Sequence, residues 1–181
     1  MVRFFVLFLV LQAALFGAEL TPWAQAYFVV PWTNAIAAVS AWLVTVFDPN
    51  VVAMGKVLRS TANGFAVSIE SGCNGVEACI VLVAAVLAFP APWRNKLIGL
   101  FAGILAVQGL NIVRVISLFY IGQWNLKAFE WAHLYVWQAL IMLDVLVVWL
   151  VWVRTLPRDG EVGPGEPPDA PAGIDTVPAA T

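Results

Sequence analysis

The sequence predicts an all-α fold, a polytopic membrane helix bundle of about five membrane segments with a small extracytoplasmic hairpin. Of the 181 residues, 62% are apolar and 11% are charged, against about 45–50% and about 25% in typical soluble domains. Five apolar runs approach the ~20 residues that a helix needs to span a bilayer. This composition excludes a soluble enzyme, and a formal net charge of −2 gives no basis for binding nucleic acid.

The first two apolar runs are the weakest candidates for membrane spans. Residues 4–17 are short and follow Arg3, so a removed signal peptide is an alternative. We expect this run to be retained, because no small-x-small cleavage site follows Phe16. The second run, residues 30–47, contains Pro31 near its start and is interrupted by polar side chains.

A polar stretch separates the second run from the third. Within it, Val51 to Leu58 and Phe65 to Ile69 are rich in β-branched residues and flank a turn-like Ser-Thr-Ala-Asn-Gly at 60–64. This pattern predicts a hairpin outside the bilayer that leads directly into Cys73.

The three clearest membrane segments follow, at residues 76–91, 97–121 and 134–153. After Arg154 the composition changes to Pro, Gly, Ala and acidic residues, which cannot bury enough apolar surface to offset chain entropy. We therefore expect a membrane-embedded domain over residues 1–154 and a disordered cytoplasmic tail over residues 155–181.

Basic residues in short loops indicate the orientation. Arg94 and Lys96 lie between the third and fourth runs, and Arg154 follows the fifth, so both places read as cytoplasmic. The opposite ends of these runs, which carry Cys73, Arg114 and His133, then share the outer face. If both early runs cross the membrane, the number of crossings places the N-terminus on the outer side. Arg3 opposes that placement. A re-entrant early run would instead place the N-terminus on the cytoplasmic side.

Cys73 lies in Ser71-Gly72-Cys73-Asn74-Gly75, at the entrance of the third run. The glycines allow a tight turn, and the N-terminus of the following helix would favour a thiolate there. The same N–H groups could stabilise a tetrahedral oxyanion. A small buried cysteine after a glycine turn is the structural alternative.

Arg114 and His133 strengthen the functional interpretation. A guanidinium inside an apolar run must find partners, and Asn111 and Ser117 place polar groups on the same helix face. An interfacial, snorkelling arginine is the alternative. His133 is the one histidine of the chain and is the natural acid or base for a thiol. Together the three types form the parts of a thiol acyl-transfer site.

Three further polar residues lie in the runs. Glu77 falls one turn after Cys73 and would orient the histidine, neutralise the arginine, or form a structural salt bridge. Cys79 is too far along the helix from Cys73 for an unstrained disulfide, so it reads as a packing residue. Asp144 lies too deep for direct chemistry and is expected to be a structural partner.

The segments Ser71-Gly72-Cys73-Asn74-Gly75-Val76-Glu77 and Asn111-Ile112-Val113-Arg114-Val115, together with His133, resemble the exosortase/archaeosortase family of membrane transpeptidases. The resemblance covers about residues 48–153, and the compact chain is similar to the exosortase H subtype. It implies that Cys73 is the nucleophile, Arg114 the stabiliser of the substrate carbonyl or oxyanion, and His133 the acid/base. Glu77, Asn74 and Asn111 would support them.

The resemblance also implies the substrate and its location. Members of this family cleave C-terminal sorting signals, made of a short recognition motif, a membrane helix and a basic tail, and transfer the protein to an acceptor. The H subtype is associated with an Ile-Pro-Thr-Leu type motif. The implied location is the bacterial inner membrane, with the site facing the periplasm and the lipid bilayer as surroundings. We expect no cofactor and no metal.

Two other functions remain open on the residues alone. A membrane thiol-disulfide oxidoreductase would use Cys73 and Cys79 together, so both would be essential. A non-catalytic membrane scaffold or carrier would need neither thiol, and Arg114 would then only bind or pair.

Overall fold

Four helices that are long and apolar enough to cross a membrane dominate the computed structural model, which describes residues 2–156. A fifth apolar helix, α4 (Val76–Ala88), is shorter, with 13 residues. The predicted all-α membrane bundle is therefore confirmed. Residues 157–181, where the tail was expected, lie outside the described residues.

Two of the long helices are built from several pieces. The first consists of α2 (Pro22–Ala24), the π-helical turn η1 (Gln25–Val29) and α3 (Val30–Thr45). The second consists of α6 (Leu126–Trp131), the π-helical turn η2 (Ala132–Val136) and α7 (Trp137–Arg154). The other two are α1 (Val2–Glu19) and α5 (Trp93–Trp124).

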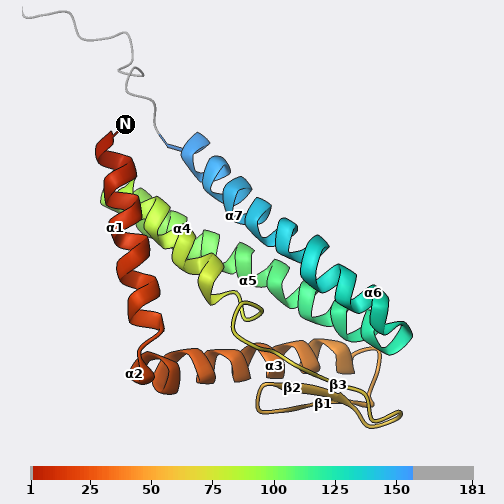
Figure 1. Ribbon diagram of the computed structural model, residues 1–181. Helices are drawn as coiled ribbons and strands as arrows, with labels where there is room; N and C mark the ends of the chain where they lie inside the picture. The colour runs from red at the N-terminus through yellow and green to blue at the C-terminus, as the bar shows by residue number, and fades with distance from the viewer. Residues whose placement is uncertain (1, 157–181) are drawn as a thin grey trace, which may run out of the picture.

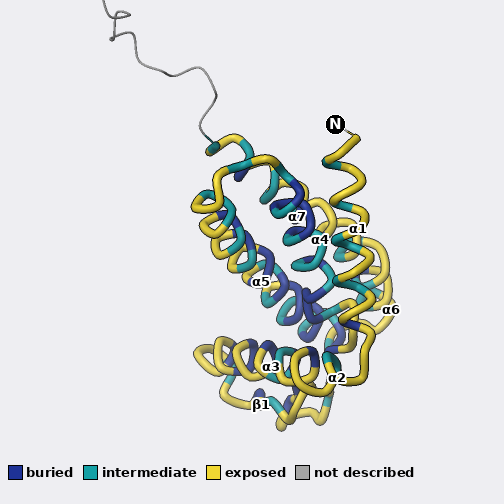
Figure 2. The backbone as a smooth tube through the Cα atoms, turned by 90° about the vertical axis from the view of Figure 1, so that its left-hand side faces the viewer, coloured by how far each residue is buried: buried dark blue, intermediate teal, exposed yellow. Residues whose placement is uncertain are grey.

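The helices α1, α4, α5 and α7 pack together, whereas α3 lies across one end of them. Helix α4 contacts α1, α5 and α7, and α5 packs along α7. Figures 1 and 2 both place α3 and the small sheet at one end, and the N-terminus with the end of α7 at the other. The second apolar run thus does not run along the bundle, so the N-terminus shares an end with the basic α4–α5 connection.

The exposure of α1 is that of a helix in lipid. Its apolar side chains face outward, Val2 with 79% and Phe5 with 62% of its surface exposed, while its one buried residue is Glu19. Carboxylates avoid lipid and turn toward protein or water, so this reversed pattern is expected in a bilayer. Figure 2 shows the same exposed surface around the outside of the helices.

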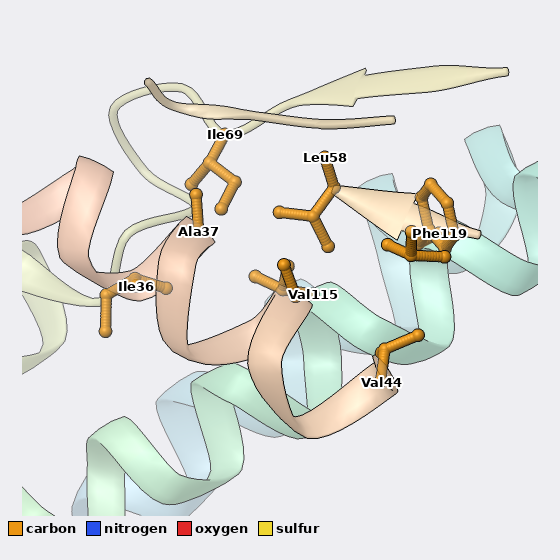
Figure 3. Packing of buried hydrophobic residues seen from close by; sticks show 9 residues of the cluster. Ile36, Ala37, Val44, Leu58, Ile69, Val115 and Phe119 are labelled. Carbon is orange, nitrogen blue, oxygen red and sulfur yellow. The ribbon is translucent and has the colours of Figure 1, made fainter. Parts of the chain in front are cut away.

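The buried side chains form two clusters. One joins α4, α5 and α7 through Leu82, Val86, Val107, Ile141 and Trp152. The other joins α3, the sheet and the far end of α5, as Figure 3 shows for seven of its labelled residues: Ile36, Ala37, Val44, Leu58, Ile69, Val115 and Phe119. The sheet is therefore fixed to the helices by apolar packing.

The sheet has three strands, β1 (Val51–Met54), β2 (Val57–Ser60) and β3 (Ala66–Ser68), in the antiparallel order β1-β2-β3. The turn predicted at 60–64 joins β2 to β3, so the predicted hairpin is confirmed. The prediction of a single strand over residues 51–58 is wrong, because the segment forms two strands. Gly55 has φ +60 and turns the chain, which divides the segment into β1 and β2.

Two glycines allow α5 to lie close to its neighbours. A Cβ on Gly99 would overlap the indole of Trp152 in α7, and one on Gly103 would lie 2.7 Å from a methyl carbon of Leu82 in α4. The Trp152 indole also donates to the carbonyl of Asn95, at 2.9 Å. Small residues let membrane helices approach closely, so this pair fixes the spacing of α5 against α4 and α7.

Candidate functional site

Cys73 lies on a turn that two glycines make possible. Gly72 has φ +84 and Gly75 has φ +73, conformations that side chains with a Cβ rarely adopt. The turn is closed by the Cys73 N–H, which donates to the carbonyl of Glu70 at 2.9 Å. A Cβ on Gly75 would also lie 2.7 Å from the amide of Gln108, so the turn sits directly against α5.

Asn74 fastens this turn to α3. Its side chain is fully buried, accepts from the N–H of Val76 at 3.0 Å and donates to the hydroxyl of Thr33 at 3.0 Å. The hydroxyl of Thr33 in turn donates to the carbonyl of Val29. Asn74 therefore links the start of α4 to the helix that crosses the bundle.

Glu77 holds the other side of the turn. Its Oε1 accepts from the N–H of Gly72 at 2.6 Å, and its Oε2 is buried with no partner among the described residues. Within residues 2–156 the ion pair is Lys56–Glu70, so Glu77 makes no salt bridge with Arg114 or His133. It supports the loop before Cys73 through a backbone bond instead.

Arg114 is buried in α5, with 1% of its surface exposed, and faces the turn. Its Nη1 donates to the carbonyl of Gly72 at 3.2 Å, and its Nη2 donates to Cys73 Sγ at 3.4 Å. Its Nε is buried and has no partner among residues 2–156. The guanidinium therefore faces the bundle interior and not the lipid surface.

His133 completes the cluster from the long C-terminal helix. Its Nε2 lies 3.3 Å from Cys73 Sγ. Its ring and the ring of Phe129 form a T-shaped pair whose centroids are 5.6 Å apart. The structure thus brings Cys73, Arg114 and His133 together from three separate segments, as the sequence predicts.

A π-helical turn sets the direction of His133. The residue lies within η2, eight positions before Ile141, which is buried on the packed face of α7. In a regular α-helix eight residues leave about 80° of rotation, whereas a π-turn removes the rotation of about one residue and leaves about 20°. The turn therefore aligns His133 with the packed face of α7.

The sulfur is less acidic than the sequence suggests. Burial raises the pKa of the Cys73 thiol, the Arg114 guanidinium acts in the opposite direction, and the carboxylates of Glu77 and Glu70 raise it further. Helix α4 begins at Val76, three residues after the cysteine, so Cys73 lies before the first turn of this helix and not within it.

Alkylation of Cys73 should therefore remain strongly pH-dependent. With Cys79 replaced by serine, the rate of iodoacetamide labelling should keep rising above about pH 9.5, where an ordinary thiol with a pKa of about 8.5 is already almost fully ionised. A raised pKa lowers the thiolate fraction at neutral pH, so labelling there should be slower than in the denatured chain. Mass spectrometry across a pH series measures both rates. Labelling that levels off near neutral pH would contradict this assignment.

Asn111 and Gln108 back the turn from α5. Asn111 is fully buried, and both polar atoms of its side chain lack a partner among the described residues. It lies against Gly75 and makes no hydrogen bond to Arg114. Gln108 donates to Cys79 Sγ at 3.2 Å. Cys79 is thus placed with Gln108, away from the partners of Cys73, and both cysteines are free.

Thr33, which fixes Asn74, was not identified from the sequence. It lies 41 positions from Asn74, and no short motif joins the two residues. The expected role of Asp144 as a structural partner is not met by a hydrogen bond, because its Oδ2 is buried without a partner among residues 2–156.

A groove of about 360 Å³ opens beside the site between α1, η1, α3, α4 and α5. Its lining is apolar apart from Gln108 and Cys79 and consists of Leu15, Phe28, Trp32, Val76, Cys79, Ile80, Val83, Ile104 and Gln108. The groove reaches Val76, the first residue of α4, and therefore begins three positions from Cys73.

Comparison with known proteins identifies the family. A family model described as transmembrane exosortase matches residues 1–152, a range that contains the cluster around Cys73. No curated protein and no solved structure matches the chain.

Proposed function

The chain belongs to the transmembrane exosortase family, and we propose that it is a cysteine transpeptidase or peptidase that cleaves C-terminal sorting signals of exported proteins. One observation carries the proposal: Cys73 Sγ lies 3.3 Å from His133 Nε2 and 3.4 Å from Arg114 Nη2. A thiol, an acid/base and a fixed cation within hydrogen-bond distance are what acyl transfer through sulfur requires.

The reaction begins with the neutral thiol. As Cys73 Sγ attacks the substrate carbonyl, its proton passes to His133 Nε2, and the negative charge that develops on the carbonyl oxygen is stabilised by Arg114. The buried Nε–H of Arg114 has no partner among the described residues and is a donor for that oxygen. The imidazolium then protonates the departing amine, the peptide C–N bond breaks, and a thioester remains on Cys73.

An acceptor nucleophile resolves the thioester. An amine that gives its proton to His133 attacks the thioester carbonyl, the C–S bond breaks, and Cys73 is released. Water in the same role gives hydrolysis. The family and the charge pattern support a location in the bacterial inner membrane. Arg3, the α4–α5 connection and Arg154 would lie on the cytoplasmic side and the site on the periplasmic side.

The groove beside α4 is suited to the membrane helix of a sorting signal. Its lining is mostly apolar, and it reaches Val76, the first residue of α4 after the turn that carries Cys73. A substrate helix in this groove would enter the membrane beside α4, with the preceding recognition motif, of the Ile-Pro-Thr-Leu type, at Cys73.

The decisive experiment is mass spectrometry of an acyl adduct. A reporter carrying Ile-Pro-Thr-Leu, an apolar helix and a basic tail is incubated with the purified chain, quenched with acid and digested. We expect an acyl mass on the peptide that contains Cys73, removable by hydroxylamine. Absence of this adduct in a chain that cleaves the reporter would contradict the thioester route.

Replacing Cys79 by serine distinguishes this proposal from a thiol-disulfide enzyme. Cys79 lines the groove beside Gln108 and does not contact His133 or Arg114, so the substitution should leave kcat within about twofold of wild type, and any effect on the substrate helix should appear in KM. An oxidoreductase that cycles a Cys73–Cys79 disulfide would instead lose its activity. Initial rates of reporter cleavage, compared with the wild-type chain at equal amounts in the membrane, measure the difference.

A further inference from the structure

Strand β3 has one free edge. It pairs only with β2, and Leu58 lies opposite Val67 in that register. The Ser60 N–H donates to the Phe65 carbonyl at 2.8 Å, and the Ile69 N–H donates to the Lys56 carbonyl at 3.0 Å. Antiparallel ladders alternate, so Phe65, Val67 and Ile69 bond to β2.

The backbone groups of the two residues between them point away from β2. These residues, Ala66 and Ser68, are exposed, and their N–H and C=O groups form no hydrogen bond with another of residues 2–156. An edge with unused donors and acceptors is a template for another extended chain.

The chain on either side of β3 lies near the helix that carries His133. Just before the strand, Phe65 lies against Gly122, which Phe129 of α6 also approaches. Five residues after the strand ends at Ser68, the chain reaches Cys73, whose sulfur lies 3.3 Å from His133 Nε2. The strand that has the free edge is therefore separated from Cys73 by only four residues.

We propose that the substrate's recognition segment binds as an added strand on the free edge of β3, with its scissile bond at Cys73. The inference rests on the proposed function and specifies how the substrate is held. Main-chain hydrogen bonds to Ala66 and Ser68 supply affinity and fix the peptide's register, while side-chain pockets select the motif. Because the strand has only two outward residues, the recognised segment is short.

Proline substitutions test the edge without disturbing the β2–β3 ladder. Ala66→Pro and Ser68→Pro each remove one outward N–H group, whereas proline is tolerated on edge strands. The variants are made in the full Cys73→Ala chain, and binding of the Ile-Pro-Thr-Leu reporter is measured by fluorescence anisotropy. Each should weaken the Kd about three- to tenfold, the effect of one net backbone hydrogen bond.

The matched control is Ala53→Pro. Ala53 lies on β1, and its N–H points away from β2 on the opposite edge of the sheet, as the β1–β2 register and the Thr61 N–H bond to the Asn50 carbonyl require. Its Kd should stay within about twofold. Equal weakening by all three prolines would indicate a general loss of the sheet and would overturn the inference.

A second arm needs no enzyme variant. Reporters in which an ester replaces one backbone amide of the motif lack one N–H donor, and their KM with the wild-type chain should rise about three- to tenfold at unchanged kcat. Unchanged Kd in both proline variants and unchanged KM for the esters would overturn the added strand. A wild-type chain that binds the reporter but does not cleave it would overturn the proposed function alone. Loss of self-association, with peptide affinity intact, would assign the edge to a second copy and overturn the inference.

Discussion

Replacing Cys73 by alanine should reduce reporter cleavage to the level of membranes that lack the protein. The sulfur lies within hydrogen-bond distance of both His133 and Arg114, and alanine leaves no group at this position that can form an acyl intermediate. Loss of the nucleophile of such a unit lowers kcat by about 10⁴-fold or more. Release of the reporter's soluble part, followed by gel electrophoresis, measures the rate.

Cys79→Ser is the matched control for this experiment, because it removes the other cysteine thiol, which lies in α4 beside Gln108, and leaves the contacts of Cys73 with His133 and Arg114 intact. Reporter binding by the Cys73→Ala chain should persist, since the substitution leaves the turn and the groove in place. Substantial cleavage by Cys73→Ala would remove Cys73 from the mechanism and with it the proposed thioester.

Replacing Arg114 by lysine should lower kcat by about 10²- to 10³-fold, the usual cost of losing one oxyanion donor. The guanidinium bonds to the Gly72 carbonyl and to Cys73 Sγ through two different nitrogens. An ammonium group keeps the charge but cannot reproduce that planar geometry, so the positions of both the turn and the substrate oxygen change. Reporter kcat and KM should separate, with the larger change in kcat.

Arg59→Lys provides the control for this second prediction. Arg59 lies on β2 and is exposed, so the same change of side chain should leave kcat and KM unaltered. Thermal unfolding of the Arg114→Lys chain in detergent shows whether the bundle is retained. A folded Arg114→Lys chain with kcat within twofold of wild type would exclude Arg114 as a transition-state stabiliser.

The reactive cluster could be predicted because polar residues are rare in this chain. Each ionisable side chain in an apolar segment needs a partner, so Arg114 indicated a bundle-facing site before any contact was known. The loop charges placed Cys73, Arg114 and His133 at one end, and the structure brings them within hydrogen-bond distance. These predictions depend on the side of the membrane, the depth in the apolar segment and the type of each residue, all of which can be inferred from hydropathy and charge.

The course of α3 could not be predicted from hydropathy. The helix over Pro22–Thr45 is long and apolar enough to span a membrane, yet it lies across the end of the bundle. Its direction depends on packing against the sheet and α5, through residues such as Ala37 and Val44. Those contacts join segments that are far apart in the sequence, so no local pattern reports them.

The exact start of α4 after the Cys73 turn and the π-helical turn η2 each depend on a shift of only one to three residues along a helix. Whether α4 begins at Cys73 or at Val76 determines whether the helix end can acidify the thiol, and sequence patterns locate helix ends only to within a few residues. The π-turn that directs His133 has no signature in the residue composition of the helix. Both features depend on tertiary contacts.

The brevity of α4 has a consequence for depth. Its 13 residues rise about 20 Å, whereas the hydrocarbon of a bilayer is about 30 Å thick. Lys96 donates to the carbonyl of Leu87 at 2.7 Å and ties one end to the basic connection, so the shortfall of about 10 Å falls at the end that carries the sulfur. If α4 crosses the bilayer with Lys96 at one surface, Cys73 lies below the level of the phospholipid headgroups at the other. Bulk water would be scarce at that level, so the proposed thioester would be protected from hydrolysis until another nucleophile arrives.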